Sequence, residues 1–237
     1  MNRPTKNLTS LLIATALAVL PYISSLASPI RVDQQVRTAL QLDRNVARGA
    51  ALYAKNCARC HGDEALGSAA QIIPALAGQR RPYLLKQLAD FTELERDSRE
   101  MQHVLSDPKL SEPQAWADVA GYLNSLQPAH FPATGDGAGV ELGEAIFHEQ
   151  CASCHEQDAR GDDDGFIPSL RDQHYSYLVR QIRSIAAWHR LDVDDNLVRF
   201  LDSMDTEEMN AVADYLSRMR GPVKDRSRLN DDGTVDQ

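Results

Sequence analysis

The stretch Cys57-Ala58-Arg59-Cys60-His61 returns as Cys151-Ala152-Ser153-Cys154-His155, and this repeated Cys-x-x-Cys-His pattern decides the fold. Two thiols at this spacing can add to the two vinyl groups of one haem, while the histidine that follows binds its iron. The two copies use all four cysteines of the chain, so no thiol remains for a disulfide or a nucleophile. We therefore expect two covalently bound haem c groups. Their attachment residues are Cys57, Cys60 and His61 for the first, and Cys151, Cys154 and His155 for the second.

Two other kinds of site also use paired cysteines. Two such pairs can bind one structural zinc ion, and a single pair can act as a thioredoxin-like redox centre. A zinc site does not require His61 and His155 directly after the second cysteine. A redox pair is expected after a strand, whereas the sequence around these motifs has helical periodicity. The pattern favours haem over both alternatives.

The two motifs belong to one unit that is repeated with a constant shift of 94 positions, the separation of Cys57 from Cys151. The same shift, without a gap, superimposes further pairs: Pro74 and Pro168, Gln79 and Gln173, Tyr83 and Tyr177, Gln87 and Gln181, and Arg96 and Arg190. Such a register indicates duplication of one unit. We expect domains at 28–127 and 140–220, a linker rich in Pro and Gly at 128–139, and a polar, disordered tail at 221–237.

Each unit is predicted to be mostly α-helical. The periodicity predicts a first helix over 45–56 and 140–150, and a middle helix over 82–91 and 175–187. The last helix follows Ser111-Glu112-Pro113 in the first unit and a capping box, Asp205 with Glu208, in the second.

The N-terminus has the layout of a secretory signal, which we place at 1–27. Arg3 and Lys6 precede an apolar run from Leu11 to Ile23, and small residues follow it. Cleavage predicts a protein that is exported to the periplasm without stable membrane insertion, and an uncleaved signal would leave it membrane-anchored.

The formal net charge is −9. An acidic surface argues against binding to nucleic acid or to an anionic membrane, and it favours redox protein partners that carry a basic docking patch.

The chain resembles the dihaem class I cytochromes of the cytochrome c4 type. Besides the haem motifs, the stretches Ile73-Pro74-Ala75-Leu76-Ala77-Gly78-Gln79 and Tyr83-Leu84-Leu85-Lys86-Gln87-Leu88 carry this resemblance. It implies two tandem class I cytochrome c domains, each a small helical fold wrapped around one haem. It also implies that the carbonyls of Pro74 and Pro168 accept a hydrogen bond from the free ring nitrogen of His61 and His155.

Class I cytochromes complete the coordination of iron with a methionine. In the first unit, Met101 lies in what resembles the methionine loop of the family, but counting back seven residues from Leu110 reaches His103. We favour Met101 and keep His103 as the alternative. With His103 the haem would have two histidine ligands and a lower potential.

The second unit departs from this pattern. The position equivalent to Met101 is Asp195, and the position that corresponds to the family ligand is Leu197. The candidates for the sixth ligand are Met204 and His189, and an open position is a third alternative. Met204 can instead pack against Met209 at the start of the last helix.

Two hypotheses for the function follow. The first is a periplasmic carrier that passes single electrons between respiratory partners, because the sequence contains no hydrolytic triad, paired carboxylates or phosphate loop. The second is a haem enzyme, or the redox subunit of one, that uses the second haem. Outside the motifs, the equivalent Arg96 and Arg190 are expected either to pair with haem propionates or to be solvated charges.

Overall fold

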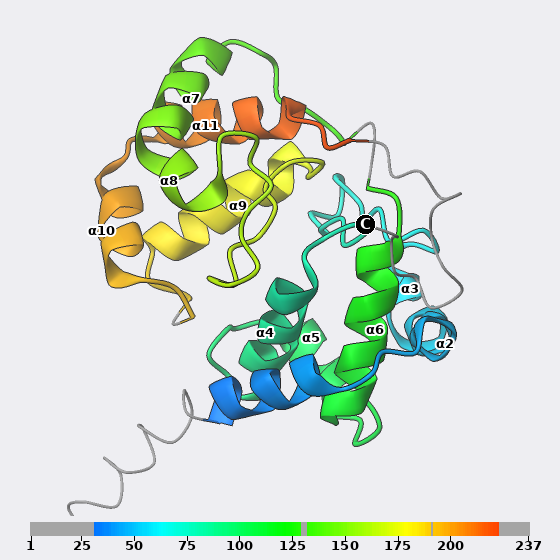
Figure 1. Ribbon diagram of the computed structural model, residues 1–237. Coiled ribbons are helices and arrows are strands. Elements are labelled where there is room, and N and C mark those ends of the chain that lie inside the picture. Colours follow the sequence, from blue (N-terminus) through cyan, green and yellow to red (C-terminus); the bar gives the residue numbers. More distant parts are fainter. Residues whose placement is uncertain (1–30, 129–131, 191, 223–237) are drawn as a thin grey trace, which may run out of the picture.

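Two helical lobes make up the protein in the computed structural model, which describes residues 31–128, 132–190 and 192–222 (Figure 1). The predicted signal at 1–27 and most of the predicted tail lie outside these residues. The first lobe contains α2 (Val46–Asn56), α3 (Ala58–His61), α4 (Arg81–Thr92), α5 (Arg99–Leu105) and α6 (Pro113–Ser125). The second contains α7 (Val140–Ile146), η1 (Phe147–Cys151), α8 (Ala152–His155), α9 (Tyr175–Ala186), α10 (Asp195–Ser203) and α11 (Thr206–Arg218). The β-structure of the described residues consists of isolated bridges, which confirms the mostly α-helical prediction.

The first and last helices of each lobe cross at close range. A Cβ at Gly49 on α2 would collide with the backbone carbonyl of Asp118 on α6. A Cβ at the equivalent Gly143 on α7 would collide with the carbonyl of Ala211 on α11. Both crossings therefore require glycine, which the duplication has kept.

Each lobe has its own hydrophobic core. The core of the first lobe contains Tyr53, Leu85 and Trp116, and that of the second contains Phe147, Leu178 and Leu216. The capping box at the start of α11 is present, with Asp205 and Glu208 exchanging hydrogen bonds of 2.9 Å, as the sequence predicts.

A helical segment at 31–41 precedes α2 and was not expected from the sequence. Val32, Val36 and Ala39 on this segment are buried in the core of the first lobe. Their spacing of four and three residues puts them on one helical face, which is the signal that could have revealed the segment.

Helices also replace the expected loops between the middle and last helices. In the first lobe Ser98 caps the start of α5, and its side chain accepts a hydrogen bond from the Met101 N–H. In the second lobe Asp194 caps the start of α10, and its side chain accepts from the N–H groups of Asn196 and Leu197. Met101 and Leu197 therefore lie on short helices rather than in loops.

The helix that enters the attachment motif differs between the lobes. In the first lobe α2 is a regular α-helix up to Asn56. In the second lobe α7 ends at Ile146 and one π-helical turn, η1, reaches Cys151. A π-turn carries one extra residue per turn, so the predicted helix at 140–150 exists but changes its winding just before the motif.

Candidate haem-binding sites

The attachment motif has the same local structure in both lobes. The N–H of Cys57 closes the last turn of α2 on the Tyr53 carbonyl at 2.8 Å, and α3 then carries Cys60 and His61. Cys57 is half-buried and Cys60 is exposed, and the same holds for Cys151 and Cys154. The motif thus presents one inner and one outer thiol in each lobe.

Burial raises the pKa of the inner thiols to about 11, for Cys57 and for Cys151, and the neighbouring cysteine adds to the effect. A redox-active cysteine instead has a lowered pKa, so the direction of this shift argues against a thioredoxin-like pair.

The histidines of the motifs are held by proline carbonyls. Nδ1 of His61 lies 3.2 Å from the carbonyl oxygen of Pro74, and Nδ1 of His155 lies 3.2 Å from that of Pro168. This confirms the contact that the family resemblance implies. Because Nδ1 is hydrogen-bonded, Nε2 is the ring nitrogen left for iron. Burial lowers the pKa of both imidazoles, which keeps the lone pair of Nε2 available.

A glycine next to each proline makes this arrangement fit. Gly67 has φ +69° and Gly161 has φ +72°, and these two positions are equivalent in the repeat. A Cβ at Gly67 would lie 2.5 Å from the carbonyl oxygen of Pro74, and one at Gly161 would collide with Pro168 in the same way. Glycine is thus needed both for the left-handed backbone and for close approach.

The donor set of each lobe fits one haem c. It provides two thiols and one imidazole with a fixed tautomer, repeated in two separate cores. In the part of the chain that the structure describes, no group of three His, Cys, Asp or Glu residues is arranged to hold a metal ion, so the two cysteine pairs do not meet at a zinc site.

The candidates for the sixth ligand of the first haem lie on α5. Met101 is half-buried and packs against the buried cluster of Phe91, Leu105 and Leu110. His103 is exposed. Residues two apart on a helix point to opposite sides, so Met101 and His103 face different surroundings.

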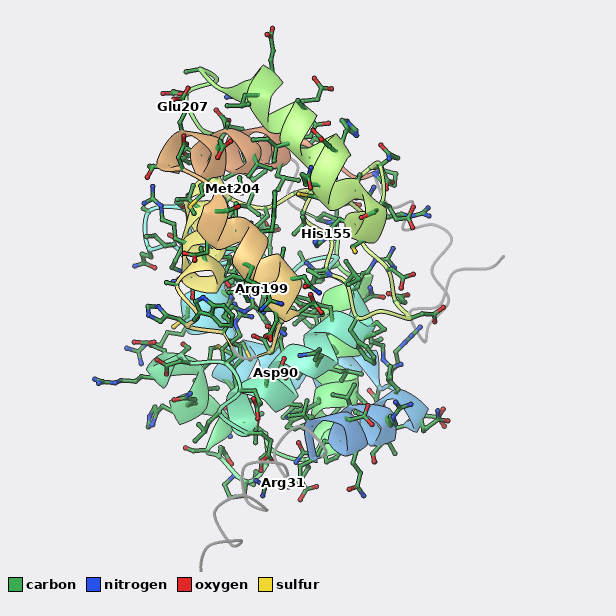
Figure 2. All side chains as sticks on the ribbon, turned by 90° about the vertical axis from the view of Figure 1, so that its left-hand side faces the viewer. Arg31, Asp90, His155, Arg199, Met204 and Glu207 are labelled. Carbon is green, nitrogen blue, oxygen red and sulfur yellow. The ribbon has the colours of Figure 1, made fainter. Side chains whose placement is uncertain are left out.

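In the second lobe, Leu197 is the residue at the position where the family resemblance predicts a ligand. It is half-buried and packs against the core. Met204 ends α10, is 9% exposed and belongs to the same core, in the lobe that also holds His155 (Figure 2). His189 is exposed and lines a surface cavity of about 450 Å³ together with Leu94 and Trp188.

The two lobes are joined by a symmetric pair of glutamine contacts that sequence reasoning missed. The side chain of Gln79 bonds to both the N–H and the carbonyl of Ser169, each at 2.9 Å. The side chain of Gln173 bonds to both the N–H and the carbonyl of Ala75, each at 3.0 Å. Since Gln79 and Gln173, and Ala75 and Ser169, are equivalent positions, the interface has a pseudo-twofold axis. The signal in the sequence was a polar residue kept in both repeats away from the motif.

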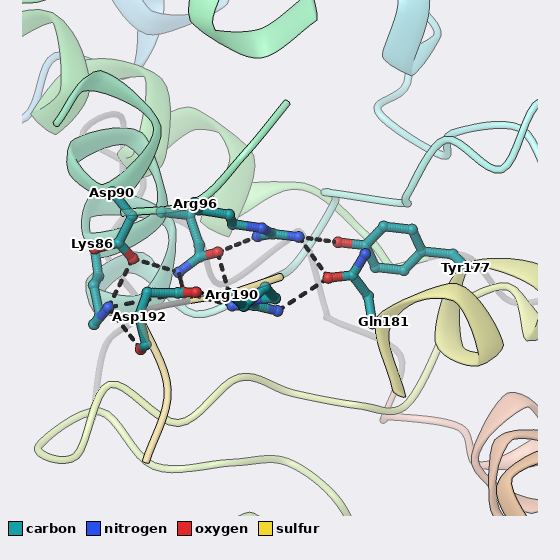
Figure 3. Close-up of polar contacts among 8 residues, drawn as sticks. Lys86, Asp90, Arg96, Tyr177, Gln181, Arg190 and Asp192 are labelled. Carbon is teal, nitrogen blue, oxygen red and sulfur yellow. Dashed lines mark hydrogen bonds and ion pairs between the residues drawn. The ribbon is translucent and has the colours of Figure 1, made fainter. Parts of the chain in front are cut away.

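Arg96 and Arg190 lie in the same interface and are not solvated charges. They are 7% and 8% exposed, and their backbones form an antiparallel bridge. Both guanidinium groups donate to the side-chain oxygens of Gln87 and Gln181, one from each lobe (Figure 3). Arg96 also donates to the Tyr177 hydroxyl at 3.0 Å. The arginines therefore join the repeats through protein groups.

One layer of this interface is asymmetric. Lys86 donates to the Asp90 carboxylate at 2.7 Å and to the Asp192 carbonyl at 3.1 Å, and Asp192 pairs with Arg190 (Figure 3). Burial raises the pKa of Asp90 to about 7 against the opposing effect of Lys86, and Asp192 adds to the rise. Burial acts on Asp192 too, but the hydrogen bond from Arg190 outweighs it and lowers that pKa.

Known proteins resemble this chain over both lobes. The cytochrome c family model matches residues 46–127 and 140–220. The chain is 32% identical to the thiosulfate dehydrogenase electron acceptor of Stutzerimonas stutzeri, over 72% of this chain and 82% of that protein. It is 30% identical to cytochrome c4 of Pseudomonas aeruginosa, over 68% of this chain and 82% of that protein.

Among solved structures, reduced cytochrome c4 from Pseudomonas stutzeri matches with a TM-score of 0.66. The match covers 75% of this chain and all of that one, at 24% sequence identity, and supports the likeness in fold.

Proposed function

Because the chain belongs to the cytochrome c family, as a dihaem protein of the cytochrome c4 type, we propose that it carries single electrons between respiratory partners in the periplasm. The observation that carries the proposal is that in both lobes a proline carbonyl holds an imidazole in one tautomer beside a thiol pair. Rigid ligands change little between the ferric and ferrous states, which favours fast electron transfer.

The bound haems supply the change of redox state, and the protein fixes their ligands and surroundings. We propose His61 and Met101 as the iron ligands of the first haem, since Met101 lies on the inner side of α5. His155 is the proposed ligand of the second haem, with Met204 or His189 as candidates opposite it.

The periplasmic location is supported by the signal-like sequence at 1–27 and by the need to attach haem c outside the cytoplasm. None of the helices within 31–128, 132–190 and 192–222 combines the length and apolar character needed to span a bilayer.

The charges of the two repeats indicate how partners dock. Residues 28–127 contain equal numbers of acidic and basic residues, whereas residues 140–220 carry a net charge of −9. The contrast is sharpest in the segments that carry the motifs. Residues 46–64 have a net charge of +1, and the equivalent residues 140–158 have −5 and no Lys or Arg.

The acidic side chains of the second segment are available to a partner. Glu141, Glu144 and Glu149 are exposed, and they form no ion pair with any residue that the structure describes. Glu149 lies five residues before the exposed Cys154 along the chain. We propose that a partner with a basic patch docks on the second lobe, over the haem edge that Cys154 marks.

A relative named as an electron acceptor of thiosulfate dehydrogenase supports the carrier role. The alternative function, a haem enzyme or its redox subunit, is favoured by Leu197, because an aliphatic side chain cannot bind iron where the family places its ligand.

Carbon monoxide separates the two functions. A carrier with two six-coordinate irons leaves the spectrum of the reduced protein unchanged under carbon monoxide. If the second iron has an open position, one of the two haems in each molecule binds carbon monoxide. Low-temperature EPR of the oxidised protein then identifies each ligand pair. A high-spin signal from one haem, together with carbon monoxide binding, would replace the carrier by the enzyme.

A further inference from the structure

The glutamine contacts between the lobes end on the peptide units that hold the haem histidines. Pro168 accepts the hydrogen bond from His155, and the next residue, Ser169, is the one that Gln79 of the first lobe holds. Pro74 accepts from His61, and the next residue, Ala75, is held by Gln173 of the second lobe. Each lobe thus contacts the backbone that orients the histidine of the other.

Both glutamine side chains are fixed before they reach across. Oε1 of Gln79 accepts from the N–H of Arg80 at 2.8 Å, and Oε1 of Gln173 accepts from the N–H of His174 at 3.0 Å. A side chain that is hydrogen-bonded to its own backbone is fixed in one rotamer. A shift of its lobe therefore also shifts the peptide group that it contacts in the other lobe.

The contact also satisfies peptide groups that have little access to water. Ala75 and Gln173 are 6% and 7% exposed. Without the amide of Gln173, the N–H and the carbonyl of Ala75 would lose these bonds in a buried place, which is costly. The segment would then shift to find other partners, and Pro74 would shift with it.

We propose that Gln79 and Gln173 are positioning residues that act across the interface, each setting the imidazole orientation, and so the reduction potential, of the haem in the other repeat. A carbonyl that accepts from Nδ1 makes the imidazole a stronger donor to iron and stabilises the ferric state. Loosening that carbonyl weakens the effect and raises the potential. The inference rests on reversible reduction of both haems, which the proposed function requires.

The test compares Gln79→Ala with Gln173→Ala in the full-length, haem-loaded protein. The potential of each haem is measured in a redox titration, with the haems distinguished by their paramagnetic NMR signals. Gln79→Ala is expected to raise the potential of the second haem, and Gln173→Ala that of the first. In the half-reduced protein, the ratio of reduced second haem to reduced first haem is expected to change about threefold. It should rise in Gln79→Ala and fall in Gln173→Ala.

The haem methyl shifts in the NMR spectrum give a second readout, because they depend on the orientation of the axial imidazole. They are expected to move in the second haem for Gln79→Ala and in the first haem for Gln173→Ala. Gln87→Ala and Gln181→Ala are the matched controls, since these glutamines join the lobes through Arg96 and Arg190 without touching the proline segments. They are expected to leave both potentials and both methyl patterns unchanged.

A shift confined to the haem of the mutated lobe would overturn the inference. Equal shifts in the control variants would also overturn it, because they would show a general loosening of the interface. If the unmodified protein cannot be reduced and reoxidised reversibly, the proposed function fails instead, so the two failures are distinguishable.

Discussion

The two repeats hold their haem histidines in the same way and differ in the features around them. Both hold histidine by a proline carbonyl, pack a glycine against that proline and offer a glutamine to the other lobe. They differ in the winding of the helix before the motif, in the residue predicted to bind iron opposite the histidine, and in the charge around the outer cysteine. After duplication, the contacts that position each histidine stayed the same, while the helix before the motif, the candidate sixth ligand and the surface charge diverged.

The independence of the two sites can be tested by removing one of them. Replacing Cys151 and Cys154 by alanine is expected to abolish covalent attachment of the second haem and leave the first intact, because each lobe has its own core. Mass spectrometry of the denatured protein would show one haem in place of two. The matched variant, Cys57 and Cys60 to alanine, should retain the second haem. Loss of both haems from either variant would mean that the lobes mature only together.

The sixth-ligand positions of the two haems can be made alike in two ways, by removing the methionine from the first or by adding one to the second. Met101→Leu is expected to open the first iron, so that the reduced protein binds carbon monoxide at that haem and its potential falls. His103→Ala is the control and should leave that haem unchanged. If His103→Ala opens the iron and Met101→Leu does not, the assignment of the ligand reverses.

Leu197→Met is expected to make the second site resemble the usual one by adding a thioether at the family position. The potential of the second haem should rise relative to the unmodified protein, because methionine stabilises the ferrous state. Met204→Leu and His189→Ala, measured in parallel by EPR, show which side chain the new methionine displaces. An unchanged potential and EPR spectrum would place Leu197 away from the iron.

The charge contrast can be tested at the equivalent positions Lys55 and Glu149, with Glu144 changed alongside Glu149. The probe is a lysine-rich monohaem cytochrome c, whose electron exchange with this protein is followed by stopped flow at low ionic strength. Glu149→Lys, combined with Glu144→Lys, is expected to slow the exchange about tenfold, and Lys55→Glu to leave it nearly unchanged. The same probe with acylated lysines should lose this sensitivity. If Lys55→Glu accelerates the exchange by as much per unit charge as the Glu144 and Glu149 changes slow it, net charge alone, rather than a docking site, controls the rate.

The asymmetric ionic layer is expected to have the smallest effect, on stability against pH. The pKa of Asp90 is about 7 in the folded chain and 3.8 in the unfolded one, so the folded state binds the proton more tightly between these values. Stability should therefore fall as pH rises from about 4 to about 7. Asp90→Asn removes this contribution, and its Tm should vary less over that range. Parallel Tm curves for the two proteins would contradict the raised pKa.

The repeat register predicted most of the fold, and the motif predicted the attachment residues. The helices at 31–41 and at α5 and α10 were missed because they are short or lie in stretches that resemble a loop of the family. The interface was missed because a glutamine in a sequence looks the same whether it faces solvent or another lobe. Gln79 and Gln173 acquire their role only when the lobes meet.

The pseudo-twofold axis has a consequence for the ancestry of the chain. An interface in which Gln79 meets Ser169 while Gln173 meets Ala75 is self-complementary, so two identical single-haem proteins could already have assembled through it. Gene fusion would then have tied together a working homodimer. Only after fusion could Lys86, Asp90 and Asp192 arise on one side alone, since a homodimer must repeat every contact twice.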